Sequence, residues 1–167
     1  MKSALFALSA DPVTKGHFDI VARALRIVDT VYIATVESTG KKGSLFTFEE
    51  RNYMLKQVFH MTSTVVLEKP ITGMTVDYAK QLGVSALLRG IRDYTDLDYE
   101  FKLANMNRLL STRRGLPIET IFIAADPALS MYSSTTVREL IRLGDDSWKC
   151  FVPECIHEYI GHIDTSM

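Results

Sequence analysis

The stretch Ser9-Ala10-Asp11-Pro12-Val13-Thr14-Lys15-Gly16-His17 follows a short apolar run and precedes a helical pattern. The run at 3–9 is typical of a buried strand, and apolar residues recur at helical spacing from Phe18 to Val28. The stretch therefore joins a first strand to a first helix. It carries hydroxyls, a carboxylate, cations and a glycine that permits close backbone approach. Because a helix N-terminus attracts anions, we interpret it as a phosphate-binding turn.

The rest of the chain repeats this alternation. Further strands are expected at 31–36, 64–67, 85–88 and 118–124, and further helices at 48–59, 73–82, 95–110, 133–143 and 153–160. Alternating strands and helices predict an α/β fold: a Rossmann-like, doubly wound, five-stranded parallel sheet with helices on both faces and a C-terminal helix. No internal repeat or linker divides the chain, so we expect a single domain over residues 1–167.

The composition excludes several classes of protein. The 167 residues are 47% hydrophobic and 23% charged, as in ordinary globular proteins. A net charge of -1 gives no bulk electrostatic case for binding a nucleic-acid polymer. No apolar run approaches the ~20 residues that span a membrane, and the N-terminal run is unlike a secretory signal. Cys150 and Cys155 lack metal-ligand spacing, which favours free thiols. We expect a cytoplasmic protein with no membrane partner and no protein-bound metal.

Basic and hydroxyl side chains gather after the predicted strands. Ligands of parallel sheets bind beyond the carboxyl ends of the strands. Four such places carry cations, hydroxyls or a helix N-terminus: 9–17, Lys41 with Lys42, Arg89 with Arg92, and 133–136 with Arg138. Taken singly, each could be a solvated loop, an ion pair or a helix cap. Because all four fall on one edge of the sheet, a shared anion site is favoured.

The motifs of covalent and metal catalysis are absent from the sequence. There is no GxxxxGK[ST], GxGxxG or GxSxG, and the four histidines lack metal-ligand spacing. What remains is charge stabilisation without an evident nucleophile. That suits direct in-line phosphoryl or nucleotidyl transfer, in which the protein positions reactants and neutralises developing charge.

Two motifs resemble those of a known superfamily. Thr14-Lys15-Gly16-His17 resembles the (H/T)xGH motif of the nucleotidyltransferases, and Ser133-Ser134-Thr135-Thr136-Val137-Arg138 resembles their ISSTxxR signature. Within that superfamily the chain is similar to the bacterial phosphopantetheine adenylyltransferases from about residue 3 to 160. Supporting stretches lie at 41–51, 76–79, 88–92, 98–100 and 105–108.

The resemblance implies a reaction of coenzyme A biosynthesis. ATP and 4′-phosphopantetheine would give dephospho-coenzyme A and pyrophosphate, with Mg²⁺, in a cytoplasmic homohexamer. His17 would stabilise the transition state and Thr14 would help to hold the triphosphate. Four residues would bind the acceptor: Ser9, Lys41 (or Lys42), Thr75 and Arg89. ATP would contact Ser9, Ala10, His17, Gly90, Ile91, Arg92, Glu100, Leu129, Ser130, Met131, Tyr132, Ser133, Ser134 and Thr135.

The chain departs from this family at the first turn. The family usually reads PGTFDP where this chain has 7–12, so Leu8 replaces a glycine, Ser9 a threonine and Ala10 an aromatic residue. These departures keep two alternatives open. One is another nucleotidyltransferase, acting on nicotinate mononucleotide or glycerol phosphate, and the other is a non-catalytic nucleotide-binding module. The helix at 95–110 has two apolar stripes, so it is either sandwiched within its own domain or covered by a partner subunit.

Overall fold

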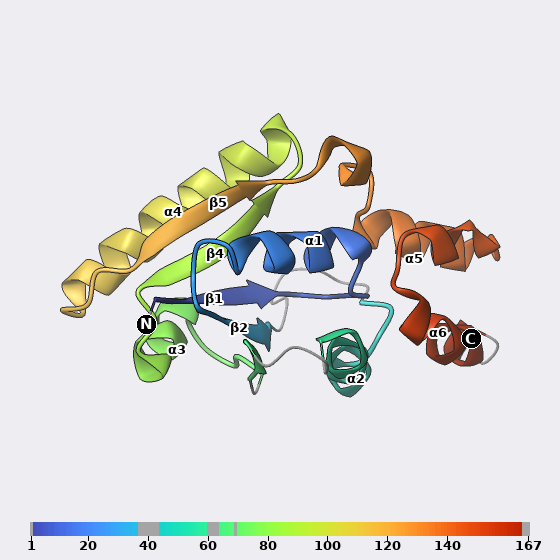
Figure 1. The fold of residues 1–167 in the computed structure, drawn as a ribbon, viewed down its shortest axis with the longest axis horizontal. Coiled ribbons are helices and arrows are strands. Elements are labelled where there is room, and N and C mark those ends of the chain that lie inside the picture. The colour runs from blue at the N-terminus through green and yellow to red at the C-terminus, as the bar shows by residue number, and fades with distance from the viewer. Residues whose placement is uncertain (1, 37–43, 60–63, 69, 165–167) are drawn as a thin grey trace.

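The fold is a parallel sheet whose five strands follow the predicted runs. A computed structural model describes residues 2–36, 44–59, 64–68 and 70–164. The strands are β1 (Ser3–Leu8), β2 (Thr30–Thr35), β3 (Val65–Leu67), β4 (Ala86–Ile91) and β5 (Glu119–Ala124). They pair in parallel in the order β3-β2-β1-β4-β5, with β1 at the centre (Figure 1). The predicted doubly wound α/β fold is confirmed.

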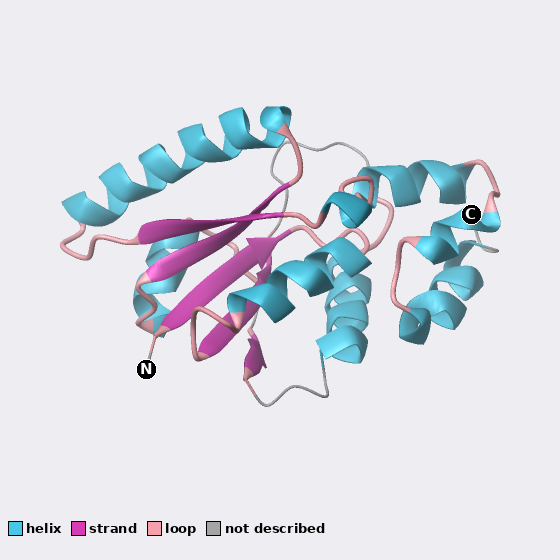
Figure 2. Cartoon of the chain, turned by 45° about the horizontal axis from the view of Figure 1, so that its top comes forward, coloured by secondary structure: helices cyan, strands magenta, loops and turns pink. Residues whose placement is uncertain are grey.

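Helices lie on both faces of this sheet (Figure 2). They are α1 (Lys15–Ala24), α2 (Phe48–Phe59), α3 (Thr75–Leu82), α4 (Tyr94–Arg113), α5 (Ser134–Arg142) and α6 (His157–Asp164), with short 3-10 turns at Pro127–Leu129, Asp146–Cys150 and Glu154–Ile156. Figure 1 shows α5 and α6 beyond the arrowhead end of β1, at the carboxyl edge where ligands of such sheets bind. Within the described ranges, no helix combines the length and apolarity needed to cross a membrane.

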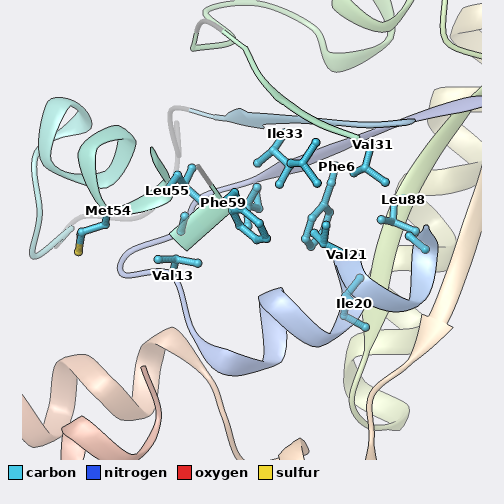
Figure 3. Packing of buried hydrophobic residues seen from close by; sticks show 14 of the residues in the cluster. Phe6, Val13, Ile20, Val21, Val31, Ile33, Met54, Leu55, Phe59 and Leu88 are labelled. Carbon is cyan, nitrogen blue, oxygen red and sulfur yellow. The ribbon is translucent and has the colours of Figure 1, made fainter. Parts of the chain in front are cut away.

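The core consists of two layers, one on each face of the sheet. Alternate residues of β1 point to opposite faces, so Phe6 packs in one layer and Leu5 in the other. The larger layer joins the sheet to α1, α2 and the C-terminal helices, and Figure 3 shows Ile20 of α1 and Phe59 of α2 within it. Burial on both faces explains why these strands are apolar runs without polar alternation.

Helix α1 begins earlier than its apolar pattern predicts. The prediction placed its start near Phe18 and its end at Val28, but the helix runs from Lys15 to Ala24. Thr14 is the N-cap, so the polar first turn belongs to the helix although it carries no apolar residue. Val28 is buried through a turn after the helix instead.

Strand β4 is longer than predicted, which moves three candidate site residues. Arg89, Gly90 and Ile91 lie inside the strand and not beyond it. Pairing with β1 stops at Leu87, whereas β5 continues alongside as far as the pair Ile91 and Ala124. The strand continues because its other neighbour still supplies hydrogen-bond partners.

Three helix boundaries also differ from the prediction. Helix α3 begins at Thr75 and not at Gly73, and α4 extends to Arg113. Pro153 caps a 3-10 turn before α6, so it is not the first residue of that helix. These ends were missed because caps and short 3-10 turns leave little periodic signal.

The apolar stripes of α4 are only partly covered by the rest of the described chain. Tyr99 is 66% exposed, Phe101 56% and Met106 47%, while the buried residues of this 20-residue helix are Asn107 and Ser111. The alternative in which α4 is sandwiched within its own domain is therefore wrong for the described residues.

Candidate active site

The first turn of α1 is held by a reciprocal cap between Thr14 and His17. The His17 backbone N–H donates to Thr14 Oγ1 at 3.4 Å, and the Thr14 backbone N–H donates to His17 Nδ1 at 3.0 Å. This is a capping box in which histidine takes the place of the usual Glu or Gln. The TxGH spacing thus fixes the orientation of the imidazole as well as the start of the helix.

The same contacts set the protonation state of His17. Because a backbone N–H can only donate, Nδ1 must be the unprotonated nitrogen, and the proton of the neutral ring lies on Nε2. Burial and, secondarily, the charge of Arg92 lower the pKa of His17 from its ordinary 6.5 to about 4. At neutral pH the ring is therefore a neutral donor through Nε2.

Tyr132 joins this cap to the loop before α5. Thr14 Oγ1 donates to the Tyr132 carbonyl at 3.2 Å and lies 3.0 Å from His17 Nδ1. Gly16 makes the approach possible, because a Cβ at that position would lie 3.2 Å from the Tyr132 carbonyl oxygen. The close backbone approach expected at Gly16 is thus made by another part of this chain.

The C-terminal segment supports the other side of the turn. The Lys15 backbone N–H donates to the Phe151 carbonyl at 2.9 Å, and Lys15 Nζ donates to the Cys150 carbonyl at 2.8 Å. The ring of Phe151 lies 5.0 Å from that of Tyr132. Lys15 was expected to offer a donor for phosphate, but the structure engages its ammonium with the protein backbone.

Arg89 lies between β1 and α4. Its guanidinium donates to the Ala7 carbonyl at 2.7 Å, and its Nε lies 3.4 Å from Glu100 Oε2. That oxygen is buried without a hydrogen bond in the described structure. Burial raises the pKa of Glu100, although Arg89 opposes the shift. The pair joins Arg89, which was predicted to bind the acceptor, to Glu100, which was predicted to bind ATP.

Arg92 is oriented by the start of α4. Its Nε and Nη2 donate to the two carboxylate oxygens of Asp96 at 2.7 and 2.9 Å, while Asp93 caps the helix. This bidentate pair holds the guanidinium close enough to His17 to contribute to its lowered pKa. Gly90 lies between Arg89 and Arg92 in the sequence. A Cβ at this position would lie 3.1 Å from the side chain of Ile20. Gly90 therefore lets α1 pack closely on β4.

The position of Asp11 in the turn suggested that its carboxylate would be free to contact a ligand, but the structure engages it with the protein. Its carboxylate accepts the backbone N–H groups of Leu45 and Phe46 at 3.2 and 3.0 Å and lies 3.5 Å from Arg138. Arg138 also donates to the Asp11 carbonyl at 2.7 Å and to Thr135 Oγ1 at 3.1 Å. Both residues are engaged in holding the turn to α5.

The loop from Leu129 to Thr135 leads into α5 beside this turn. Ser133 caps α5 by accepting the Thr136 N–H at 3.0 Å, and Ser134 Oγ donates to the Pro12 carbonyl at 2.8 Å. Ser130 Oγ bonds to the Pro127 carbonyl, and Met131 is 71% exposed. The N-terminus of α5 thus lies against the turn at 9–17 that follows β1 (the β1 turn), as expected if ligands bind beyond the carboxyl ends of the strands.

The contacts bring most of the predicted site together. Ser9 is half-buried, and Ala10 is fully buried, backbone included, with φ +48°. Thr75, the first residue of α3, is not joined to the His17 group by the contacts of the described residues. Its neighbour Met74 contacts Arg114, after α4, at 3.3 Å. Lys41 and Lys42 lie outside the described residues.

Arg51 was missed by the sequence reasoning. Its guanidinium donates to the Ser9 carbonyl at 2.9 Å, and the residue is only 4% exposed. A signal was present, because Arg51 stands one turn before Met54 and Leu55 on the buried face of α2. A charged residue at an apolar position of the pattern indicates a specific partner.

The described residues hold no cluster of three or more histidine, cysteine, aspartate or glutamate side chains that could bind a metal ion. Of the carboxylates described above, Glu100 pairs with Arg89, Asp96 with Arg92 and Asp11 with Arg138. Among the described residues these ion-paired carboxylates do not form a protein cage of the kind that holds a divalent cation.

Comparison with known proteins assigns the chain to a family. The cytidylyltransferase-like family matches residues 6–140. The chain is 38% identical over 160 residues to a phosphopantetheine adenylyltransferase of Brucella ovis, covering 93% of this chain and 94% of the relative. The corresponding protein of Brucella suis is 39% identical over 157 residues, covering 92% of each.

A solved structure supports the fold independently. Nicotinic acid mononucleotide adenylyltransferase of Plasmodium falciparum, complexed with NaAD, matches with a TM-score of 0.71 over 97% of this chain and 96% of its own. At 15% identity the likeness concerns the fold alone. Together with the near-full-length matches, these findings show that the chain belongs to the phosphopantetheine adenylyltransferases, within the cytidylyltransferase-like family of nucleotidyltransferases.

Proposed function

We propose that this adenylyltransferase joins ATP to 4′-phosphopantetheine by direct in-line attack, in the pathway to coenzyme A. A phosphate oxygen of the acceptor forms a bond to the α-phosphorus of ATP, while the bond to the bridging oxygen breaks and pyrophosphate leaves. The observation that carries the proposal is near-full-length identity of 38% to phosphopantetheine adenylyltransferases, in a chain whose TxGH motif orients a neutral His17. No covalent intermediate is required.

His17 is proposed to act on charge that forms at the α-phosphate. Its Nε2–H would donate to a non-bridging oxygen, whose charge grows as the transition state forms. Because Nδ1 is already fixed by Thr14, the donor needs no reorientation during the reaction. Thr14 would contribute to holding the triphosphate while it maintains this cap.

The acceptor phosphate is assigned to Ser9, Arg89 and Lys41 or Lys42. Arg89 has one guanidinium nitrogen engaged with Ala7 and another beside Glu100, so Nη2 is the atom proposed to face the phosphate. Thr75 would meet the pantetheine arm. This assignment uses cations because the attacking group is itself an anion.

ATP is assigned to a second set of residues. The residues proposed to contact it are Ser9, Ala10, Gly90, Ile91, Arg92, Glu100, Leu129, Ser130, Met131, Tyr132, Ser133, Ser134 and Thr135. The N-terminus of α5 would receive the β- and γ-phosphates. Mg²⁺, when bound with ATP, would neutralise phosphate charge and help to align the leaving pyrophosphate.

The wider setting follows the family resemblance. We propose that residues 1–167 act as one nucleotidyltransferase domain in a cytoplasmic homo-oligomer, with a hexamer as the expected assembly. The exposed residues of the apolar stripes of α4 support the oligomer, because exposed patches of this kind mark interfaces. Tyr99, Phe101 and Met106 are the residues expected to meet another copy.

An acceptor-resolved pyrophosphate assay tests the proposed reaction. The protein with Mg²⁺ and ATP is supplied separately with 4′-phosphopantetheine, nicotinate mononucleotide and glycerol phosphate. Release with 4′-phosphopantetheine alone supports the proposal, and release only with another acceptor overturns it. ATP binding without release from any acceptor would identify a non-catalytic module, the reading that Leu8 and Ala10 motivate.

A further inference from the structure

Three arginines from different elements hold one side of the β1 turn. Arg89 of β4 donates to the Ala7 carbonyl at 2.7 Å, and Arg138 of α5 donates to the Asp11 carbonyl at 2.7 Å. Between them, Arg51 of α2 donates to the Ser9 carbonyl at 2.9 Å. Alternate carbonyls from the end of β1 into the turn that follows, those of Ala7, Ser9 and Asp11, are therefore each bound by a cation.

Arg51 differs from the other two because no carboxylate of the described residues pairs with it. Arg89 lies beside Glu100 and Arg138 beside Asp11. Among the described residues, Arg51 contacts only the Ser9 and Thr47 carbonyls and the ring of Phe48, whose centroid is 5.1 Å away. A guanidinium that is taken out of water without a carboxylate partner is costly, and a nearby anionic ligand would offset that cost.

The bond to Ser9 acts on the part of the turn that has the least conformational freedom. The Ser9 carbonyl belongs to the peptide unit that leads into Ala10, whose φ of +48° is rare for a residue with a Cβ. Holding this carbonyl fixes the peptide plane on which the direction of the Ser9 side chain depends.

We propose that Arg51 is a positioning residue for adenylyl transfer. It fixes Ser9 so that the hydroxyl faces the two phosphates that react, and its uncompensated charge favours the anions at this turn. The inference rests on the proposed function, because Ser9 is assigned there to both substrates. Arg51 itself stays behind the turn, where it can act only through Ser9 and through its charge.

A double-mutant cycle tests the role of Arg51. Variants Arg51→Lys, Arg51→Gln, Ser9→Ala and the two combinations are compared for kcat and KM toward ATP and 4′-phosphopantetheine. We expect Arg51→Gln to lower kcat/KM about tenfold or more, and Arg51→Lys, which keeps the charge, to recover part of the loss. In the Ser9→Ala background the same substitutions should cost at most about threefold, because the positioned hydroxyl is gone.

Stability measurements separate positioning from folding. The thermal midpoint of each variant is recorded, and kinetics are measured well below it. Lys80→Gln is the matched control, since Lys80 on α3 also donates to a backbone carbonyl, that of Arg114 at 3.0 Å, and should leave both KM values unchanged. If Arg51→Gln does not fold, the Arg51→Lys and Ser9→Ala cycle carries the test alone.

The outcomes divide as follows. Additive losses in the cycle, or wild-type kinetics in folded Arg51 variants, overturn the role of Arg51 while wild-type activity upholds the proposed function. A wild-type protein that releases no pyrophosphate with 4′-phosphopantetheine overturns the proposed function instead.

Discussion

The Thr14 backbone N–H and the His17 imidazole share a hydrogen bond of 3.0 Å that determines which ring nitrogen carries the proton. A helix cap and a reactive group are usually alternative explanations for such a histidine. Here one geometry forms the cap and also leaves Nε2–H as the donor for the proposed chemistry, because capping occupies Nδ1. Substitutions at this motif must therefore be designed to separate the cap from the chemistry.

Replacing His17 should slow the reaction without weakening ATP binding. We expect His17→Ala to lower kcat by at least ~10²-fold with little change in the KM for ATP, because the group acts on charge formed in the transition state. His17→Asn retains an acceptor for the Thr14 N–H. Its kcat should be as low as that of His17→Ala, and its free energy of unfolding should be higher. Equal losses in binding and rate would show that His17 only holds the substrate.

The stability of the protein should depend on pH through His17. Its folded pKa of about 4 lies below the ordinary 6.5, so between these values the unfolded chain binds a proton that the folded chain does not. The contribution is complete above pH 6.5 and is lost as pH falls toward 4. Urea unfolding at pH 7 and pH 5 should show a larger loss for the wild type than for His17→Asn. An equal loss of unfolding free energy in the wild type and in His17→Asn would assign the pH dependence to other groups.

Arg89 should affect the acceptor more than the nucleotide. We expect Arg89→Ala to raise the KM for 4′-phosphopantetheine about tenfold or more, and the KM for ATP less, because the cation is assigned to the acceptor phosphate. The variant also leaves the buried Glu100 carboxylate without its cation, so its thermal midpoint is compared with that of Arg89→Ala/Glu100→Gln, which is used for stability only because Glu100 is assigned to ATP. A larger effect on ATP than on the acceptor would contradict the assignment.

Gly90 should tolerate no side chain, for reasons of packing. A Cβ would lie 3.1 Å from Cγ1 of Ile20, which is closer than ordinary van der Waals contact, so the Ile20 side chain or α1 would have to shift. We expect Gly90→Ala to reduce the free energy of unfolding by about 1–3 kcal/mol, measured by chemical denaturation. Gly73→Ala is the matched control, since a Cβ there meets no atom within 4 Å. Equal effects of the two would rule out the contact with Ile20 as the cause.

The exposed face of α4 should control assembly. Phe101→Glu places a charge on a stripe that is proposed to meet another copy, so the molar mass in sedimentation velocity should fall below that of the wild type. Lys102→Gln is the neighbouring control, because this lysine pairs with Asp98 at the surface and should leave the mass unchanged. A wild-type monomer would refute the proposed oligomer directly.

Local patterns predicted most of the fold. The apolar runs of β1 and β2 mark strands buried on both faces, and their alternation with helices determines the parallel sheet. The start of α1 was missed because its first turn is polar, and its capping box uses His17 where the familiar pattern has Glu or Gln. The end of β4 was missed because it depends on the neighbouring strand β5.

The site was predicted as a place but not as a set of contacts. Thr14, His17 and Ser133 could be predicted as site residues from their motifs, and from the rule that ligands of parallel sheets bind beyond the carboxyl ends of the strands. The pairing of Asp11 with Arg138 spans 127 residues, and no local pattern announces it. Hydrogen bonds between distant elements depend on packing, which the sequence pattern does not encode directly.

The bonds from Lys15 to Cys150 and Phe151 have a consequence for protein synthesis. A ribosome makes the turn at 9–17 early, but its partners Tyr132, Cys150 and Phe151 are translated long afterwards. A nascent chain that has reached only β5 therefore lacks the groups that hold the turn. The turn at 9–17 gains all of these partners only when the segment up to Phe151 has left the exit tunnel.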